Sequence, residues 1–114
     1  MPKSKLHPET RTVRKLQADG WVLVGKVATR MGKFASDLFG FADVIGIRSV
    51  AGHGIEVILV QATSASNVSA RVKKLDALDS VGLAVGLGIT VEVWGWYPEK
   101  DEPRVVSFNT TKHS

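Results

Sequence analysis

Residues 55–63 (IEVILVQAT) are the segment that most constrains how this chain can fold. The run is nearly continuous in apolar residues, which is typical of a strand buried on both faces rather than of a strand with one face in water. A strand of this kind needs packing partners above and below it. The sequence therefore predicts a layered domain in which helices flank a central sheet.

Turn and capping residues divide the rest of the chain into helices and strands. Pro8 and Glu9 favour the start of a helix, and Gly20 favours its end. Residues 29–36 are expected to form a loop, and the small residues of 79–88 a connection with room for one helical turn. The expected strands span about 21–28, 41–48, 55–63, 89–97 and 104–108, the last at a sheet edge, and the second helix spans about 67–78.

The order of these elements predicts the topology. Three consecutive strands favour an antiparallel meander, and a helix between the third and fourth strands favours a crossover that makes those two strands parallel neighbours. We therefore expect an α+β (α/β) fold with a mixed sheet flanked by helices. With 114 residues the chain has room for one domain, 1–114, with a flexible basic arm over residues 1–7 and a frayed tail over residues 109–114.

Composition excludes several classes of protein and site. Apolar residues make up 44% of the chain, which is enough for a packed interior and too much for a disordered chain. The absence of cysteine excludes a thiolate zinc site and a cysteine nucleophile, and it favours a reducing cytoplasm. No apolar run of a signal peptide follows the basic N-terminus. The most hydrophobic stretch, 81–93, is broken by three glycines and Glu92, so we expect no membrane span.

Net charge leaves a nucleic-acid partner open without identifying one. The chain carries a formal charge of +4 and has a pI near 9.6, a balance that is compatible with a polyanion. His7, His53 and His113 have no metal-ligand spacing, and the glycines of residues 82–88 lack the lysine and the spacing of a phosphate-binding loop. Histidine metal sites and nucleotide-binding loops are therefore not expected.

Three oxygen-bearing side chains are expected to meet at one edge of the sheet. Gln61 and Thr63 are two residues apart on the third strand, so they point to the same face, beside Asp43 on the neighbouring strand. Hydrolysis of a phosphodiester uses a divalent cation to activate water and to stabilise developing charge, and Mg²⁺ prefers oxygen ligands. These residues are the candidate site.

The order αβββαβ, with an aspartate at the second strand and the motif Gln61-x-Thr63 at the end of the third, resembles the PD-(D/E)XK nuclease superfamily and its restriction-endonuclease-like core. The segment 37–75, with DLFGFADVIGI and VQATSASNVSARVKKL, also resembles small phage and prophage nuclease-like proteins akin to VRR-NUC and Holliday-junction-resolvase types. The resemblance covers roughly residues 8–97. The sequence departs from the family pattern at two positions: it has Gln61 where the family has an acid, and Thr63 where the family has the lysine.

The resemblance implies a divalent-metal-dependent nuclease, with Mg²⁺ or Mn²⁺ as cofactor and DNA as substrate, branched or mismatched DNA being candidates. It implies a homodimer as well, and the host cytoplasm if a phage encodes the chain. Asp37 in the preceding loop, and Arg71 or Lys73 on the second helix, are candidates to replace the missing acid and positive charge. The implied catalytic residues are Asp43, Gln61, Thr63 and Glu9, the metal ligands Asp43 and Gln61, and the nucleic-acid-binding residues Arg71, Lys73, Lys74 and Lys33.

Two other functions fit the same residues. The first is a catalytically inactive module of the same fold that binds DNA through the basic arm and the second helix. The second is a phage protein-interaction component that uses Trp94, Trp96 and the edge of the last strand. Structural roles are also open: Asp43 could cap a loop, Gln61 could be a hydrogen-bonded core amide, and the lysines of the second helix could be a solvated face.

Overall fold

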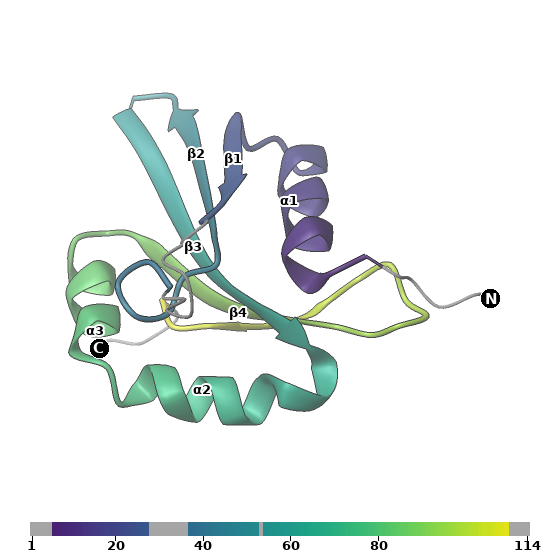
Figure 1. Ribbon diagram of the computed structural model, residues 1–114. Helices are drawn as coiled ribbons and strands as arrows, with labels where there is room; N and C mark the ends of the chain where they lie inside the picture. The colour runs from purple at the N-terminus through teal and green to yellow at the C-terminus, as the bar shows by residue number, and fades with distance from the viewer. Residues whose placement is uncertain (1–5, 28–36, 53, 110–114) are drawn as a thin grey trace, which may run out of the picture.

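The computed structural model describes residues 6–27, 37–52 and 54–109, and within them three α-helices pack against a five-stranded sheet (Figure 1). The sheet is mixed, so the α+β fold class expected from the sequence is confirmed. The elements are α1 (Pro8–Ala18), β1 (Leu23–Lys26), β2 (Val44–Val50), β3 (Gly54–Ser64), the short 3-10 helix η1 (Ala65–Asn67), α2 (Val68–Asp76), α3 (Asp79–Gly86), β4 (Thr90–Trp96) and β5 (Arg104–Ser107).

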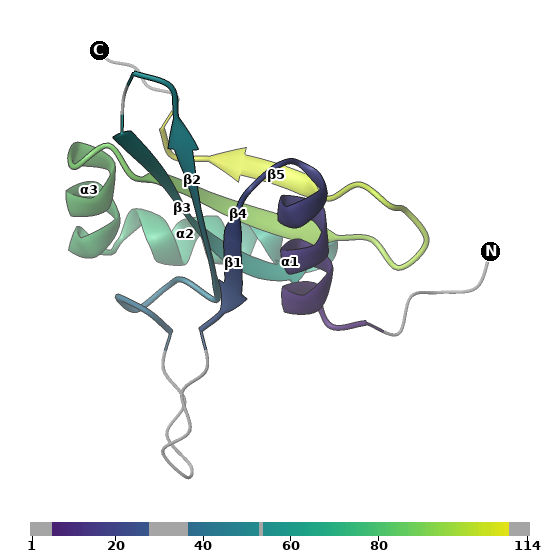
Figure 2. The ribbon, with the colours of Figure 1, turned by 90° about the horizontal axis from the view of Figure 1, so that it is seen from above.

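The strands lie in the sheet in chain order, β1-β2-β3-β4-β5. The first three form an antiparallel meander, and β4 runs parallel to β3 after the crossover through α2 and α3. The last strand pairs antiparallel with β4 and lies at the sheet edge, as Figure 2 shows. Both the predicted meander and the predicted parallel crossover are therefore confirmed.

Helices cover the two faces of the sheet, so β3 is buried on both sides. On one face Ile58 and Val60 pack with Leu16 of α1, and on the other Leu59 packs with Val68 and Leu75 of α2. We call these the α1 face and the α2 face. The nearly continuous apolar run reflects this packing over residues 58–63, whereas Ile55, near the hairpin end of the strand, is 69% exposed.

A buried polar contact fixes α1 against β4. The Thr12 hydroxyl, which has no exposed surface, donates to the Pro8 carbonyl oxygen at 2.8 Å and accepts from the Trp96 indole nitrogen at 2.9 Å. The Arg11 guanidinium lies 4.4 Å from the centre of the Trp96 ring and donates to the Tyr97 carbonyl oxygen. These contacts hold the first turn of α1, which carries Glu9, in a defined position beside the sheet.

Two predictions about local structure were wrong. Residues 79–86 form the full helix α3 rather than a connection with one turn, because Val81 and Ala84, three residues apart, both bury against the α2-face core. Asn109 is the one described residue of the expected frayed tail, and its amide side chain accepts from the Val91 nitrogen and donates to the Ile89 carbonyl oxygen. The second strand begins at Val44 rather than near Phe41, because residues 38–42 form a turn. Most of the predicted basic arm and tail lies outside the described residues.

We expect Gly95→Ala to destabilise the fold strongly. A Cβ at this position would overlap the Val68 side chain and would lie 2.9 Å from the Ala65 Cα, so β4 and the start of α2 could not approach as closely. The expected loss is about 2–3 kcal/mol of unfolding free energy, measured by urea denaturation. Gly25→Ala is the control, because nothing lies within 4 Å of its added Cβ. Equal effects of the two substitutions would contradict this account of the α2–β4 contact.

Candidate functional site

Asp43 lies where β2 begins, and its carboxylate is anchored to β3. The main chain of Asp43 continues the pairing of the sheet: its nitrogen donates to the Val60 carbonyl oxygen and its carbonyl oxygen accepts from the Val27 nitrogen, both at 2.8 Å. The carboxylate oxygen Oδ2 accepts from the Gln61 side-chain nitrogen at 2.7 Å and from the Ala62 main-chain nitrogen at 3.0 Å. The predicted adjacency of Asp43 and Gln61 on neighbouring strands and on one sheet face is confirmed.

Gln61 carries a buried oxygen that has no hydrogen-bond partner. The residue is 2% exposed, and its Oε1 is the buried side-chain atom left unsatisfied among the described residues. Leaving a buried polar atom without a partner costs about 1–3 kcal/mol, so such atoms are rare in folded proteins and a bound ion or water is one explanation for them. Because the same amide group contacts Asp43, the unsatisfied oxygen lies next to the carboxylate.

A second carboxylate reaches the same place through a tight turn. Leu38 and Ala42 exchange main-chain hydrogen bonds, and Phe39 and Gly40 both have positive φ, at 59° and 87°. The Ser80 hydroxyl of α3 donates to the Phe39 carbonyl oxygen at 2.8 Å and holds the turn against the helix. The turn directs Asp37 back toward Asp43, and the Lys74 ammonium of α2 lies 3.4 Å from the Asp37 Oδ2.

Asp43 also lines a hollow of about 360 Å³ on the α1 side of the sheet. Glu9 and His7 come from the start of α1, and Lys26 and Val27 come from the end of β1. Glu9 and Asp43, far apart in sequence, are therefore brought to one concave site. The sequence alone does not indicate Lys26, because an exposed lysine at a strand end has no distinguishing pattern. Lys26 pairs with Val44, the residue after Asp43, and this register brings Lys26 to the hollow.

The environment of Asp43 changes its proton affinity. Burial raises the pKa of Asp43 to about 6 from its ordinary value of 3.8, and the charge of Asp37 adds to the rise. The hydrogen bonds from Gln61 and Ala62 oppose it, because they stabilise the ionised form. Carboxyl groups with such raised pKa values are concentrated at functional sites, although structural networks also produce them.

The other predicted site residues differ in their burial and in their position relative to the carboxylates. Thr63 points to the α2 face with Gln61 and is likewise buried, at 5% exposed. Arg71 is half-buried on α2, whereas Lys73 and Lys74 are exposed. It is Lys74, and not the predicted Lys73 or Arg71, that lies beside the carboxylates. Lys33 lies outside the described residues.

Trp94 and Trp96 are both 5% exposed and pack in the core beneath α1. The alternative in which they form a protein-binding surface is therefore not supported. Their two rings lie 6.2 Å apart in a tilted arrangement, and Trp96 also carries the hydrogen bond to Thr12 that holds α1. Their role is packing.

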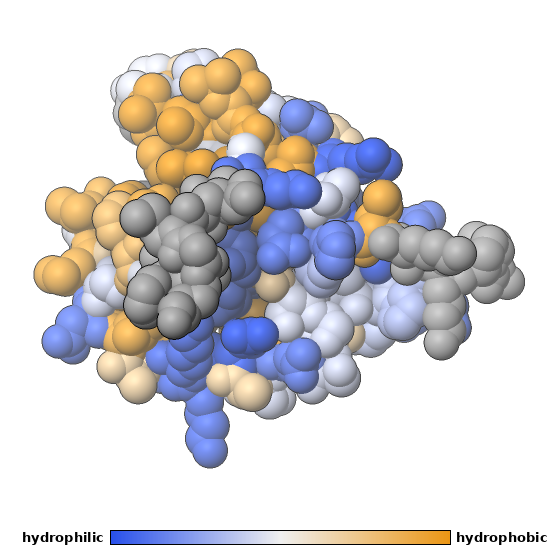
Figure 3. All heavy atoms as spheres, viewed as in Figure 1, coloured by the Kyte–Doolittle hydropathy of each residue, from blue (hydrophilic) through white to orange (hydrophobic). Residues whose placement is uncertain are grey.

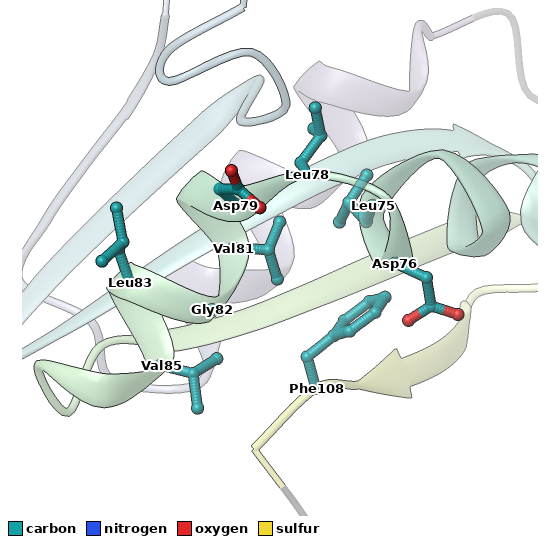
Figure 4. A pocket seen from close by; sticks show the side chains of 9 residues that line it. All are labelled: Leu75, Asp76, Leu78, Asp79, Val81, Gly82, Leu83, Val85 and Phe108. Atoms are coloured by element: carbon teal, nitrogen blue, oxygen red, sulfur yellow. The ribbon is translucent and has the colours of Figure 1, made fainter.

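A second hollow, of about 690 Å³, lies between α2, α3 and Phe108 (Figure 4). Its lining is mainly apolar, and its charged side chains are the acidic Asp76 and Asp79. No basic residue lines it among those the structure describes, so it does not suit a phosphate. On the face seen in Figure 3, apolar surface gathers over the tip of the β2–β3 hairpin and over α3, and hydrophilic surface lies between α1 and α2.

The donor chemistry around Asp43 suits a hard cation. No group of three or more Asp, Glu, His or Cys side chains arranged to hold a metal ion occurs within the described part of the chain. Asp43, the neighbouring Asp37 and the Gln61 amide nevertheless bring oxygen atoms of the kind that bind a hard cation to one part of the sheet, and Glu9 lines the hollow that Asp43 also lines. One or two carboxylates with a neutral carbonyl and waters is the kind of site that Mg²⁺ uses.

Comparison of the chain with protein-family models, with curated proteins and with solved structures finds no match in any of the three. Among the described residues no helix has the length and apolar character needed to cross a membrane. The geometry of the site is therefore the basis for assigning a function.

We expect Asp43→Asn to stabilise the protein near neutral pH. In the wild type the folded-state pKa lies above the ordinary value, so folding is favoured by protonation and stability falls as the pH rises from 3.8 to about 6. Asparagine can accept the same two hydrogen bonds without the charge. After allowance for solvent screening, the gain at about pH 8 is about 1 kcal/mol, measured by thermal unfolding. The gain should vanish below pH 3.8, and a gain that is the same at every pH would exclude this cause.

Proposed function

We propose that the protein is a divalent-metal-dependent nuclease that acts on DNA, with Asp43 as its principal metal ligand. The observation that carries the proposal is the hydrogen bond between Asp43 and Gln61, whose buried oxygen has no partner among the described residues, together with Asp37 close to Asp43. The strand order and the crossover helix agree with the αβββαβ order of the PD-(D/E)XK superfamily. This agreement supports the resemblance that the sequence motif suggests.

The residues present fit Mg²⁺ or Mn²⁺ better than they fit a transition metal. Asp43 would hold the ion, the Gln61 carbonyl oxygen would gain the partner that it lacks, and Asp37 or Glu9 would complete the ligand set together with waters. When bound, such an ion supplies an activated water and neutralises charge on the phosphate. Thr63, buried at the end of β3, is expected only to fill the position of the missing lysine.

The basic residues of α2 are proposed to bind the DNA backbone. The end of β3 leads through η1 directly into α2, so Arg71 and Lys74 follow the site within two to three turns of the helix. The distance of three residues between them places both on one side of α2. Phosphate contacts of this kind position a substrate without reading its sequence. The net charge of +4 agrees with such a partner.

A catalytically inactive DNA-binding module is the second candidate. Two observations favour it: Thr63 cannot supply a positive charge, and Gln61 contributes a neutral oxygen where the family has a carboxylate. The basic residues of α2 would keep their role in this case. A homodimer stays a prediction under either function.

The first test is Mg²⁺-dependent cleavage of duplex, branched and mismatched DNA. We expect cleavage by the wild type and its loss in Asp43→Asn, because the principal ligand loses its charge while the fold is retained. Asp101→Asn is the matched control, since Asp101 is exposed in the turn between β4 and β5. Equal cleavage by wild type and Asp43→Asn would identify a contaminating nuclease. A wild type without activity that still binds DNA would favour the second candidate.

The second test is the salt dependence of DNA binding. With Mn²⁺ present and a phosphorothioate duplex as the ligand, replacing Arg71 and Lys74 together with alanine should weaken binding and reduce the slope of log K against log salt by about two, one for each lost phosphate contact. Preference among DNA sequences should not change. Arg14→Ala with Arg104→Ala removes the same charge from exposed positions on α1 and β5, and should leave the slope nearly unchanged. If both double variants reduce the slope equally, α2 is not the contact surface.

A further inference from the structure

The ion pair between Lys74 and Asp37 has a consequence for any cation that binds beside Asp43. Asp37 is held near Asp43 by the turn of residues 37–42, so two negative charges meet in a partly buried place. The Lys74 ammonium, 3.4 Å from Asp37, is the positive charge that partly balances them. A divalent cation and the ammonium would therefore compete for the same carboxylate.

The neighbouring amide indicates that this place is built to take a ligand. Gln61 is 2% exposed and its Oε1 has no partner among the described residues, although its nitrogen donates to Asp43. Lys74 by itself does not satisfy this oxygen. The charge of the carboxylate pair is therefore only partly balanced by Lys74, and the Gln61 oxygen beside the pair can still accept a ligand.

The contact between Lys74 and Asp37 can be exchanged for another one. Its side chain is 40% exposed, and that of Asp37 is 31% exposed, so the contact is a partly solvated one that costs little to break. The lysine stem is flexible and its ammonium is a compact point charge that binds phosphate well. A released Lys74 would lie on the helix that faces the proposed DNA backbone.

We propose that Lys74 is the resident counter-ion of the Asp37–Asp43 pair, that a divalent cation displaces it, and that the released ammonium then binds a DNA phosphate. This inference rests on the proposed nuclease function and assigns the positive charge that Thr63 cannot supply. It makes the binding of metal and of DNA mutually favourable, because each ligand removes a competing interaction of the other. By linkage the two ligands must affect one another by the same factor.

The test measures binding rather than cleavage. Mn²⁺ affinity is measured by calorimetry without DNA, and affinity for a phosphorothioate duplex is measured with and without saturating Mn²⁺. In Lys74→Gln we expect Mn²⁺ to bind about three- to tenfold more tightly, since its competitor is gone. In the wild type Mn²⁺ should tighten DNA binding by about fivefold or more, and Lys74→Gln should lose this enhancement.

Lys73→Gln is the matched control. Lys73 is exposed on the same helix and has no carboxylate within 4.0 Å among the described residues, so its replacement should leave both the Mn²⁺ affinity and the enhancement unchanged. Asp37→Asn should weaken Mn²⁺ binding. In the Asp37→Asn variant, adding Lys74→Gln should no longer change the Mn²⁺ affinity. Circular dichroism of each variant checks that the fold is retained.

The outcomes separate this inference from the proposed function. If the wild type cleaves DNA with Mg²⁺ but Lys74→Gln and Lys73→Gln give equal Mn²⁺ affinities, the counter-ion role is overturned and the nuclease stands. If the wild type binds Mn²⁺ with the expected enhancement but does not cleave, the inference is supported and the catalytic function fails. A wild type that neither binds Mn²⁺ nor cleaves overturns both.

Discussion

The burial of β3 on both faces is the constraint on which the rest of the structure depends. Because α1 packs on one side of this strand and α2 on the other, neither helix can move without exposing apolar surface of the same strand. The strand also pairs with β2 and β4, one antiparallel and one parallel. The polar residues at its end, Gln61 and Thr63, are therefore fixed in a rigid and largely dry setting.

This setting explains where charge is found around the site and where it is absent. An ionised side chain in the middle of a doubly covered strand would carry a large desolvation penalty, which a neutral amide or hydroxyl avoids. The charged groups instead come from the surrounding elements: Asp43 from the start of β2, Asp37 from a turn, and Lys74 from α2. Asp43 still bears part of the penalty, which is why burial raises its pKa. A group kept in this state at a cost to stability is more easily explained by function than by folding.

The sequence was sufficient to predict the sheet but not the contacts around the site. Periodicity and the apolar run predicted the strand order, and the two-residue spacing predicted that Gln61 and Thr63 share a face with Asp43. Helix α3 was missed because its small residues resemble a loop, and only packing against the core makes them helical. Lys26 and the Asp37–Lys74 pair were not predictable as contacts, since they depend on strand register and on a turn with two positive φ angles.

The proposed likeness to the PD-(D/E)XK pattern has a physical interpretation at the end of β3. Gln61 and Thr63 are both neutral at the positions where that pattern has an acid and a lysine, so neither residue puts an ionised group into the buried end of the strand. An acid and a lysine lie nearby as the ion pair of Asp37 and Lys74, on a turn and a helix where each is more than 30% exposed. Charged groups in these positions lie nearer to solvent, where they can exchange partners with a metal ion or a phosphate.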